Sequence, residues 1–426
     1  MSVVGKSLQE KVNLLAQYPQ TGLSLKQLVY FGQDQKPGRL FRSGLFLRDE
    51  LPIRLAHRIQ DLQKLPPLLG EMKRISAVRA AYARSMEEII DLKGIELPKC
   101  LPKHKRYPKA PKWRASFFHN FVQHNPSLLD THLDSSRGRY FNIDFSKPCT
   151  GEEYEWPESL HKFNIDFSRL LDTIRTRHDN VASELALDIQ EYRRKTKKID
   201  HSIQVFLDRF YMSRIGIRML IGQYISLVSE PPRENRVGII STRANILRII
   251  EDATESAKFI CRLSYCLFEA PPVEINCDPS LHMMYTESHL NHAVFELLKN
   301  SLRATVEYYG VDADSYPPVK VLVVKGEEDI TIRISDRGGG FSRKESSVVW
   351  SYMYTTAHET LSDDYTDTMT AASSLPPMAG FGFGLPIARL YTRYFGGDLK
   401  LVSMEGYGTD AYIQLNRLCE SAEPLQ

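Results

Sequence analysis

Three short stretches in the last third of the chain constrain its fold most, because each supplies a different part of one nucleotide site. The first, residues 292–300, reads HAVFELLKN and predicts a helix with polar residues on one face. The second, residues 336–340, reads DRGGG after a predicted strand, and the third, residues 380–384, reads GFGFG and opens another helix. In this order they predict a site that holds ATP with Mg²⁺ and places a base beside the γ-phosphate.

The predicted helix 288–309 carries His292, Glu296, Asn300 and Arg303 on nearly one face. The amide oxygen of Asn300 is a hard ligand of the kind that Mg²⁺ prefers. Glu296, one turn earlier, can accept a proton from an attacking hydroxyl or water, and His292 can tune that carboxylate through a hydrogen bond. The alternatives are a solvated helix face and, for His292, a capped or half-buried imidazole.

The second motif begins at Asp336, which ends a strand with alternating Ile330, Ile332 and Ile334. The glycines that follow, among them Gly338 and Gly340, leave backbone space for a flat ring. The Asp336 carboxylate can accept a hydrogen bond from an exocyclic amine such as that of adenine. The alternative is an ordinary Asp-Gly turn.

The third motif lets the backbone approach phosphates, and the helix that it opens favours their charge at its N-terminus. It is not a P-loop, because no Gly-Lys-Ser/Thr follows, and it lacks the strand and acidic residue of a Rossmann fingerprint. Residues 341–379 have the composition of a lid over the nucleotide. Within them, the hydroxyls of Thr355 and Thr356 are placed to contact phosphate.

The rest of the chain predicts two domains in an α+β fold. Helical patterns occupy 47–65, 75–92, 160–195, 203–228 and 241–268, the last with a Ser-Thr cap signal, and predict an all-α bundle over residues 1–270. Pro271-Pro272 marks the boundary to a mixed domain over 271–426. Its predicted strands are 319–325, 330–335, 399–404 and 410–415, with a further helix at 384–395.

Composition narrows the class of protein. A formal net charge of +3 marks neither nucleic acid nor membrane as the partner, and no apolar run is long enough for a transmembrane helix. Six scattered cysteines predict reduced, mostly buried thiols in an intracellular compartment. Residues 1–20 lack the apolar core of a secretory signal and make a poor transit peptide. A basic run at 103–114 is either a docking patch for an acidic partner or, as we favour, a solvated loop.

The three motifs look like the N, G1 and G2 boxes of the GHKL ATPase superfamily. Within it, the chain resembles the mitochondrial protein kinases that regulate α-keto acid dehydrogenase complexes, and most closely the pyruvate dehydrogenase branch. The resemblance covers most of the chain and includes residues 24–28, 50–56, 174–178, 206–211, 295–306, 335–340, 351–357, 380–386 and 403–410.

This resemblance implies an N-terminal helical bundle for docking and regulation, a C-terminal GHKL-type α/β sandwich that binds ATP, and a homodimer. It implies phosphorylation of a serine in the decarboxylase component of the pyruvate dehydrogenase complex, which inactivates that complex. It also implies docking on a lipoyl domain of the acyltransferase core, a place in the mitochondrial matrix, and Mg²⁺ and potassium near the nucleotide.

The resemblance also assigns roles within the site. Glu296 becomes the general base, His292 its modulator, Asn300 the Mg²⁺ ligand and Asp336 the adenine contact. The expected ATP-binding residues are Glu296, Asn300, Arg303, Asp336, Gly338, Gly340, Thr355, Thr356, Gly380, Phe381, Gly382, Phe383, Gly384 and Leu385.

Two departures from the family pattern stand out. Residues 97–158 look like an insertion. The longer C-terminal tail that helps lipoyl-domain binding in many members of the pyruvate branch is not found after Leu415, which leaves the docking mode open.

Three other functions compete with this hypothesis. A branched-chain 2-oxoacid dehydrogenase kinase has a similar short end. A two-component histidine kinase needs a phosphoacceptor, for which His178 is the candidate although its surroundings do not match that box. A non-catalytic ATP-binding scaffold has no need of a base at Glu296. The signatures of ordinary protein kinases are missing from the sequence.

Overall fold

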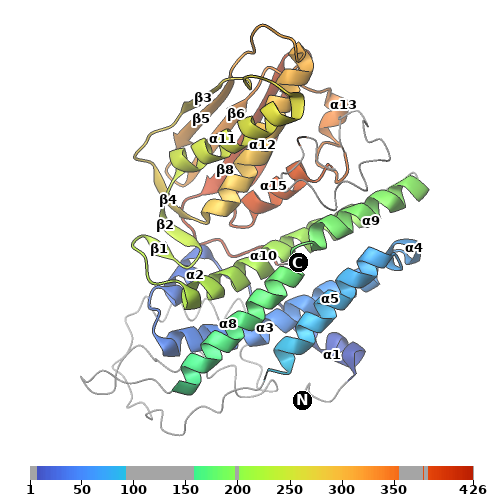
Figure 1. The fold of residues 1–426 in the computed structure, drawn as a ribbon, viewed down its shortest axis with the longest axis vertical. Helices are drawn as coiled ribbons and strands as arrows, with labels where there is room; N and C mark the ends of the chain where they lie inside the picture. The colour runs from blue at the N-terminus through green and yellow to red at the C-terminus, as the bar shows by residue number, and fades with distance from the viewer. Residues whose placement is uncertain (1–6, 93–157, 197–200, 355–377, 379–381, 426) are drawn as a thin grey trace.

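A computed structural model of the chain describes residues 7–92, 158–196, 201–354, 378 and 382–425. The proposed insertion at 97–158 and the basic run at 103–114 fall outside the described residues except for residue 158. The described part forms a helical bundle with a mixed α/β layer above it (Figure 1), which confirms the α+β class. No described helix is long and apolar enough to cross a membrane.

The bundle consists of long helices whose apolar faces meet in a shared core. Its elements are α1 (Leu8–Leu15), α2 (Leu25–Gly32), α3 (Pro37–Gln63), α4 (Pro67–Gly70), α5 (Lys73–Ile90), α8 (Glu158–Arg177), α9 (Val181–Thr196) and α10 (His201–Ser229). Helix α3 begins well before the expected residue 47, with Pro37 at a first-turn position that suits proline. Helix α10 packs on α3 and α8 and lies on the side of the bundle that faces the mixed layer (Figure 1).

The helical pattern expected over 160–195 is two helices, not one. Helix α8 ends at Arg177 and α9 begins at Val181. At the break, Arg214 of α10 donates to the carbonyl of His178 at 2.6 Å and to that of Asp179 at 3.0 Å. The arginine thus satisfies carbonyl groups at the break, where the helix stops although the apolar pattern continues.

The helix predicted over 241–268 begins later, at Ile246, and it packs on the mixed layer rather than in the helical bundle to which the sequence assigned it. Residues Ile240–Asn245 form strand β2, which pairs with β4 (His282–Tyr285) and with β1 (Arg236–Val237). Asn245 then caps α11 (Ile246–Tyr265), because its side chain accepts from the Arg248 backbone N–H at 3.0 Å. Helix α11 packs on α12 of the mixed layer, which favours a domain boundary before β2, earlier than the predicted one at 270/271.

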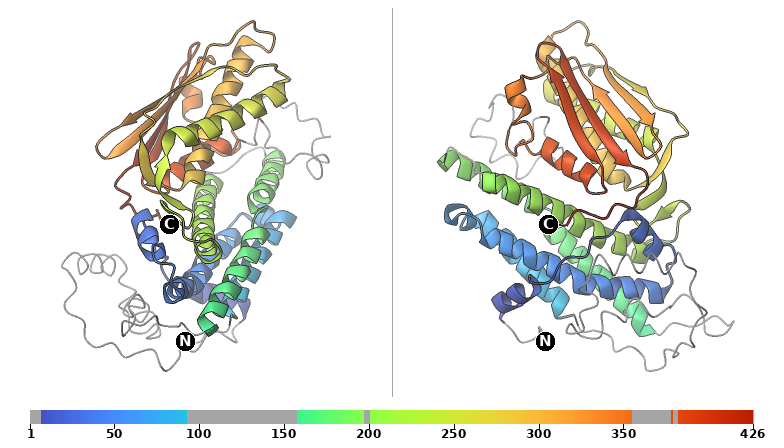
Figure 2. Two further views of the ribbon diagram at one scale, coloured as in Figure 1. Left: turned by 60° about the vertical axis from the view of Figure 1, so that its left-hand side comes forward. Right: turned by 180° about the vertical axis from the view of Figure 1, so that it is seen from behind.

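The mixed layer is a five-stranded sheet with helices on one face (Figure 2). Its strand order is β3 (Val273–Asn276), β5 (Val319–Lys325), β6 (Asp329–Ser335), β8 (Gly408–Asn416) and β7 (Asp398–Met404). The pair β3–β5 is parallel and the other pairs are antiparallel. Helices α12 (Glu287–Tyr309) and α15 (Gly384–Arg393) agree with the predicted 288–309 and 384–395 to within two residues, whereas β1 to β4 were not predicted.

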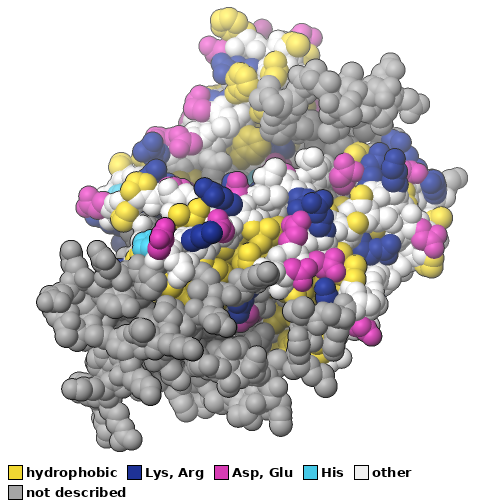
Figure 3. Space-filling model, turned by 60° about the horizontal axis from the view of Figure 1, so that its bottom comes forward, with side chains coloured by type: hydrophobic (Ala, Val, Ile, Leu, Met, Phe, Trp, Pro, Cys, Tyr) yellow, Lys and Arg dark blue, Asp and Glu magenta, His cyan; other side chains and the backbone are white. Residues whose placement is uncertain are grey.

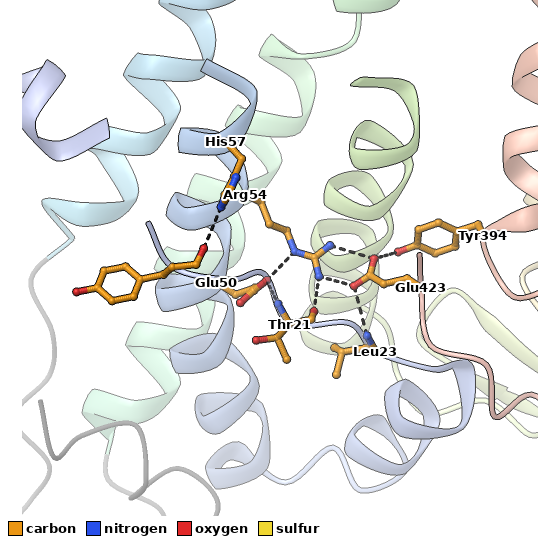
Figure 4. A network of polar contacts seen from close by, with 8 residues as sticks. Thr21, Leu23, Glu50, Arg54, His57, Tyr394 and Glu423 are labelled. Atoms are coloured by element: carbon orange, nitrogen blue, oxygen red, sulfur yellow. Dashed lines mark hydrogen bonds and ion pairs between the residues drawn. The ribbon is translucent and has the colours of Figure 1, made fainter. Parts of the chain in front are cut away.

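A buried ion network joins the bundle to the mixed layer (Figure 4). Arg54 of α3 is 1% exposed and donates from Nε to Glu50 Oε1 at 2.9 Å. Its NH1 donates to Glu423 Oε2 at 3.0 Å, and its NH2 forms an ion pair with Glu423 Oε1 and donates to the Thr21 carbonyl at 2.6 Å. The Tyr394 hydroxyl, just after α15, also donates to Glu423. One arginine thus holds two buried carboxylates from segments far apart in the chain.

The segment that carries Glu423 is tied to the beginning of the chain. The Glu423 N–H donates to the Leu23 carbonyl at 3.1 Å, and the Lys26 N–H donates to the Cys419 carbonyl at 3.3 Å. Ser24 forms an isolated antiparallel bridge with Ala422. The last described residues therefore lie against the entry to α2.

Surface charge and thiols carry little functional signal. On the face of the bundle drawn in Figure 3, basic and acidic side chains are intermingled, in keeping with the low net charge. The four described cysteines are free thiols. Cys261 and Cys419 are buried as expected, but Cys266 is exposed and Cys277 half-buried. Burial raises the pKa of the Cys261 thiol to about 11, so this cysteine is a poor nucleophile at neutral pH.

Candidate functional site

Helix α12 forms the floor of the candidate site, because its apolar face packs on α11 and α15 while its polar face carries the predicted residues. The buried apolar residues Val294, Leu298 and Leu302 recur at helical spacing, as the sequence predicted. Glu296 lies at the edge of this packing and is 8% exposed. A carboxylate that is largely withdrawn from water, yet carried on a rigid helix, suits a role as a base.

Glu296 has a partner that sequence reasoning missed. The Lys299 ammonium lies 3.0 Å from Glu296 Oε1, and Lys299 itself is 4% exposed. Residues three apart on a helix are neighbours, so a Glu-x-x-Lys spacing was the available signal. The ammonium puts a positive charge beside the predicted phosphate position.

The glycine turn meets α12 at this carboxylate. Gly384 is the first residue of α15, and a Cβ atom built on it would overlap the Glu296 Oε2 atom. Only glycine therefore allows the carboxylate and the N-terminus of α15 to lie in contact. The first and third predicted motifs come together in the structure, and the positive end of the α15 dipole lies beside Glu296.

His292 contacts the site without the predicted hydrogen bond. Its Nε2 atom is buried and has no partner among the described residues, while Glu296 Oε1 accepts from Lys299. The His292 ring packs against Tyr391 with 4.8 Å between ring centroids. Burial lowers the pKa of His292 and nearby Glu296 partly offsets this, so the imidazole is neutral at pH 7. Its influence on Glu296 is electrostatic in this structure.

Asn300 and Arg303 of α12 differ in burial, and only 11% of the Arg303 side chain is exposed. Asn300 is exposed, so its amide is free to meet a solvated ion. The Arg303 guanidinium donates from Nε to Glu307 Oε1 at 2.8 Å, one turn further along the helix. Among the described residues, no group of three His, Cys, Asp or Glu side chains could hold a metal ion. The predicted Mg²⁺ site does not need one, because an amide oxygen with phosphate oxygens and water suffices.

Asp336 is held in place by three donors. It is 7% exposed, and its Oδ2 accepts from the Ser301 hydroxyl of α12 at 2.9 Å. Its Oδ1 accepts from the N–H of Gly338 at 3.0 Å and of Thr409 at 3.2 Å. A carboxylate offers about four acceptor positions, so one is left for an exocyclic amine. Burial raises the pKa of Asp336, and these hydrogen bonds oppose that shift.

The glycines of the second motif lie where α12 meets the sheet. A Cβ on Gly338 would come within 2.6 Å of Ala304, and a Cβ on Gly340 would overlap the Met404 carbonyl at the end of β7. The chain therefore packs closely against α12 and the end of β7 beside Asp336, and side chains would not fit at these two glycine positions. Ser301 and Thr409 complete this wall and were not predicted from the sequence.

Part of the predicted site lies outside the described residues, namely Thr355, Thr356, Gly380 and Phe381. Of the rest of the third motif, Gly382 has a φ of +77°, which favours glycine. Phe383 is 8% exposed and Leu385 is half-buried against the core. The described residues thus place Glu296, paired with Lys299, against Gly384, and they place Asp336 beside Ser301 of α12.

A cavity in the bundle is separate from this site. It measures about 790 Å³ and lies between α5 and α9. Within its lining, Arg74 lies 3.0 Å from Asp188 and 3.3 Å from Glu184, whereas Lys73 is exposed to solvent.

Comparisons with known proteins match both halves of the chain. Residues 22–241 match the family model described as mitochondrial branched-chain alpha-ketoacid dehydrogenase kinase. Residues 285–418 match the model of the histidine kinase-, DNA gyrase B- and HSP90-like ATPases.

Full-length relatives carry a consistent name. The chain is 74% identical over 426 residues to the mitochondrial [pyruvate dehydrogenase (acetyl-transferring)] kinase of Schizosaccharomyces pombe, with all of both chains covered. It is 36% identical to the Arabidopsis thaliana mitochondrial kinase of the same name, covering 99% of this chain and 97% of the relative. It is 34% identical to human isozyme 3, covering 98% of this chain and 88% of the relative.

Proposed function

Because this chain belongs to the family of mitochondrial pyruvate dehydrogenase (acetyl-transferring) kinases, we propose that it transfers the γ-phosphoryl group of ATP to a serine of the pyruvate dehydrogenase decarboxylase component. The chain is a protein kinase with a GHKL-type ATP-binding domain, and it acts on the pyruvate dehydrogenase complex in mitochondria. The observation that carries the chemistry is the buried Glu296 carboxylate in contact with the glycine that opens α15.

The side chains of the candidate site each have a part in the proposed reaction. Glu296 accepts the proton of the serine hydroxyl as the oxygen attacks phosphorus. Lys299 and the N-terminus of α15 supply positive charge near the transferred group, where negative charge spreads over oxygen in the transition state. Asp336 accepts from the adenine amine and fixes the nucleotide at the far end of the site. Asn300 is the residue that would hold Mg²⁺, which would neutralise phosphate charge when bound.

Asn300→Ala should remove the dependence of ATP binding on Mg²⁺, because it deletes the amide oxygen that would coordinate the ion. ATP affinity measured by titration calorimetry with and without Mg²⁺ would show this. The matched control is Asn291→Ala, which deletes an amide from the same helix two turns earlier. If Mg²⁺ strengthens ATP binding equally in Asn300→Ala and in the wild type, Asn300 is not the metal ligand.

The competing functions differ in what they require. His178, the candidate phosphoacceptor of a histidine kinase, is 2% exposed, stacked on Tyr82 and within 3.0 Å of the Ser85 hydroxyl. Burial and the nearby Arg214 lower the pKa of His178 to about 4, and such an enclosed imidazole cannot reach a phosphate donor. A scaffold would not need a base at Glu296, and the curated relatives described above favour the pyruvate over the branched-chain complex.

Incubation with labelled ATP and each purified decarboxylase tests the proposal directly. The expected result is incorporation into a serine of the pyruvate decarboxylase, located by peptide mass spectrometry, with little or no label in the branched-chain enzyme. Label in the branched-chain enzyme alone, or on a histidine of the kinase itself, would contradict it.

The remaining assignments complete the proposal. We place the kinase in the mitochondrial matrix as a homodimer, docked on a lipoyl domain of the acyltransferase core, with potassium near the nucleotide. We also propose that residues before β2 form the regulatory bundle and those from β2 onward the ATP-binding domain, since α11 packs on α12.

A further inference from the structure

The four residues Ser351–Tyr354 are held by the bundle rather than by their own domain alone. The Tyr352 N–H donates to Gln204 Oε1 of α10 at 2.8 Å, and the Gln204 amide donates back to the Tyr352 carbonyl at 3.4 Å. The Tyr352 hydroxyl donates to Asp208 Oδ1, one turn further along α10, at 2.8 Å. Burial and the neighbouring Asp208 raise the pKa of Tyr352, so its hydroxyl stays protonated and acts as the donor.

The same tyrosine packs between α10 and the glycine turn. Its ring stacks on Tyr211 of α10 with 5.7 Å between centroids and lies 5.5 Å from the Phe383 ring. Tyr211 and Phe383 are themselves 5.9 Å apart. All three rings are at least 92% buried. Phe383 directly precedes Gly384, the residue that contacts Glu296, so this cluster reaches from the bundle to the catalytic carboxylate.

Met353 links the bundle and the glycine turn through its backbone. Its φ is +65°, an uncommon conformation for a residue with a side chain. Its N–H donates to the Gly382 carbonyl at 3.1 Å, and its carbonyl accepts from Arg193 of α9 at 2.7 Å. A Cβ on Gly382 would overlap the backbone of Met353 and Tyr354. The path of the turn at Gly382 is therefore fixed by the position of Met353, and that position is fixed by the bundle.

We propose that Gln204, Asp208, Tyr211, Tyr352 and Phe383 form a clasp, the Tyr352 clasp, by which the bundle holds residues 382–384 in position for nucleotide binding. Asp208 and Tyr352 are positioning residues, since they act on the nucleotide through Met353 and Phe383. The proposal deepens the proposed function, on which it rests for the place of the nucleotide. It assigns to a bundle helix the control of ATP affinity.

The effect on affinity follows from pre-organisation. A turn already held in its binding conformation loses less conformational freedom when phosphate arrives, and a released turn must be ordered by the nucleotide. The coupling is also reciprocal: whatever moves α10 changes nucleotide affinity, and the nucleotide resists that movement equally. Asp208 is exposed, and replacing it costs the buried Tyr352 hydroxyl its acceptor but opens no cavity in the core, so the variant should still fold.

Tyr352→Phe should weaken ADP binding about five- to tenfold, the range expected for loss of a hydrogen bond to a carboxylate. Asp208→Ala should weaken it at least as much, because the buried Tyr352 hydroxyl then lacks its acceptor. The double variant should lose less than the sum of the two single variants, because both changes break one bond. ADP dissociation constants come from titration calorimetry. At saturating ATP, kcat of Tyr352→Phe should stay within about threefold of the wild type, while KM for ATP rises. General destabilisation would instead lower kcat by reducing the amount of folded enzyme.

Tyr354→Phe is the matched control, because the Tyr354 hydroxyl also donates to a carboxylate, Glu345 at 3.2 Å, but within its own domain. Its ADP affinity should equal that of the wild type. Unchanged ADP affinity in Tyr352→Phe, additive losses in the double variant, or an equal loss in Tyr354→Phe would overturn the clasp. ADP binding needs no protein substrate. If the wild type phosphorylates neither decarboxylase while these affinities hold, the proposed function fails and the clasp stands.

Discussion

Glu296→Gln should slow phosphoryl transfer by about 10²–10⁴-fold while ATP binding stays near that of the wild type. Glutamine keeps the shape of the side chain and an oxygen that can accept from Lys299, 3.0 Å away in the native site. It cannot take the proton of the attacking hydroxyl. Single-turnover phosphorylation measures the chemical step, and titration calorimetry measures ATP affinity separately.

Glu287→Gln is the control for this experiment, because it makes the same substitution in the first turn of the same helix. Its rate should match that of the wild type. A different result for Glu296→Gln would change the assignment: if ATP affinity collapses and the rate per bound nucleotide is normal, the carboxylate holds the site together and is not the base. That outcome would also question the contact with Gly384 as the carrier of the chemistry.

Arg54→Met should destabilise the protein by about 3–5 kcal/mol, since it leaves two buried carboxylates without their shared cation. Glu50 is 3% and Glu423 6% exposed, so water cannot replace the guanidinium. The midpoint of urea unfolding should fall accordingly. Arg84→Met is the matched control, because Arg84 pairs with Glu88 while its side chain is 72% exposed. An exposed pair of this kind contributes about 0.2–1 kcal/mol.

Equal losses of stability in Arg54→Met and Arg84→Met would show that the Arg54 network contributes no more than a surface pair.

Glu50→Gln separates charge from hydrogen bonding, because glutamine can still accept from Arg54. Burial raises the pKa of Glu50 above its ordinary 4.5. At pH values between 4.5 and the raised pKa, Glu50 is protonated in the folded protein and ionised in the unfolded chain, so the folded protein binds more protons. The Glu50 contribution to stability therefore falls as pH rises through that window. The stability of Glu50→Gln relative to the wild type should increase over the same window.

The sequence predicted those parts of the fold in which a local pattern and the tertiary structure agree. Helix α12 and the strands β5, β6, β7 and β8 match their predicted ranges to within two residues, because each has one buried face and clear turn residues at its ends. The break at 178–180 was missed because the apolar pattern continues across it, and the Arg214 side chain that binds its carbonyls lies on another helix. Helix α11 was assigned to the wrong layer because amphipathicity reveals a buried face but not the element that buries it.

In the candidate site, too, local spacing predicted some residues, and others depend on the tertiary structure. Spacing along one helix brought His292, Glu296 and Asn300 to notice, and it offered Lys299 as well, at three residues from Glu296. The donors around Asp336 come from Ser301 and Thr409, whose approach depends on how α12 lies on the sheet. Glu423 meets Arg54 across 369 positions of sequence, and no local pattern signals such a pair.

The backbone contacts between residues 23–26 and 419–423 have a consequence for biosynthesis. A polypeptide made from its amino end, or drawn amino end first through a translocation pore, exposes Arg54 and Glu50 long before Glu423 emerges. Arg54 therefore cannot pair with Glu423 until residues 419–423 have been synthesised. A ribosome that stalls or a protease that clips this stretch would leave a product unable to complete its interior, and quality-control proteases would meet it as an open chain.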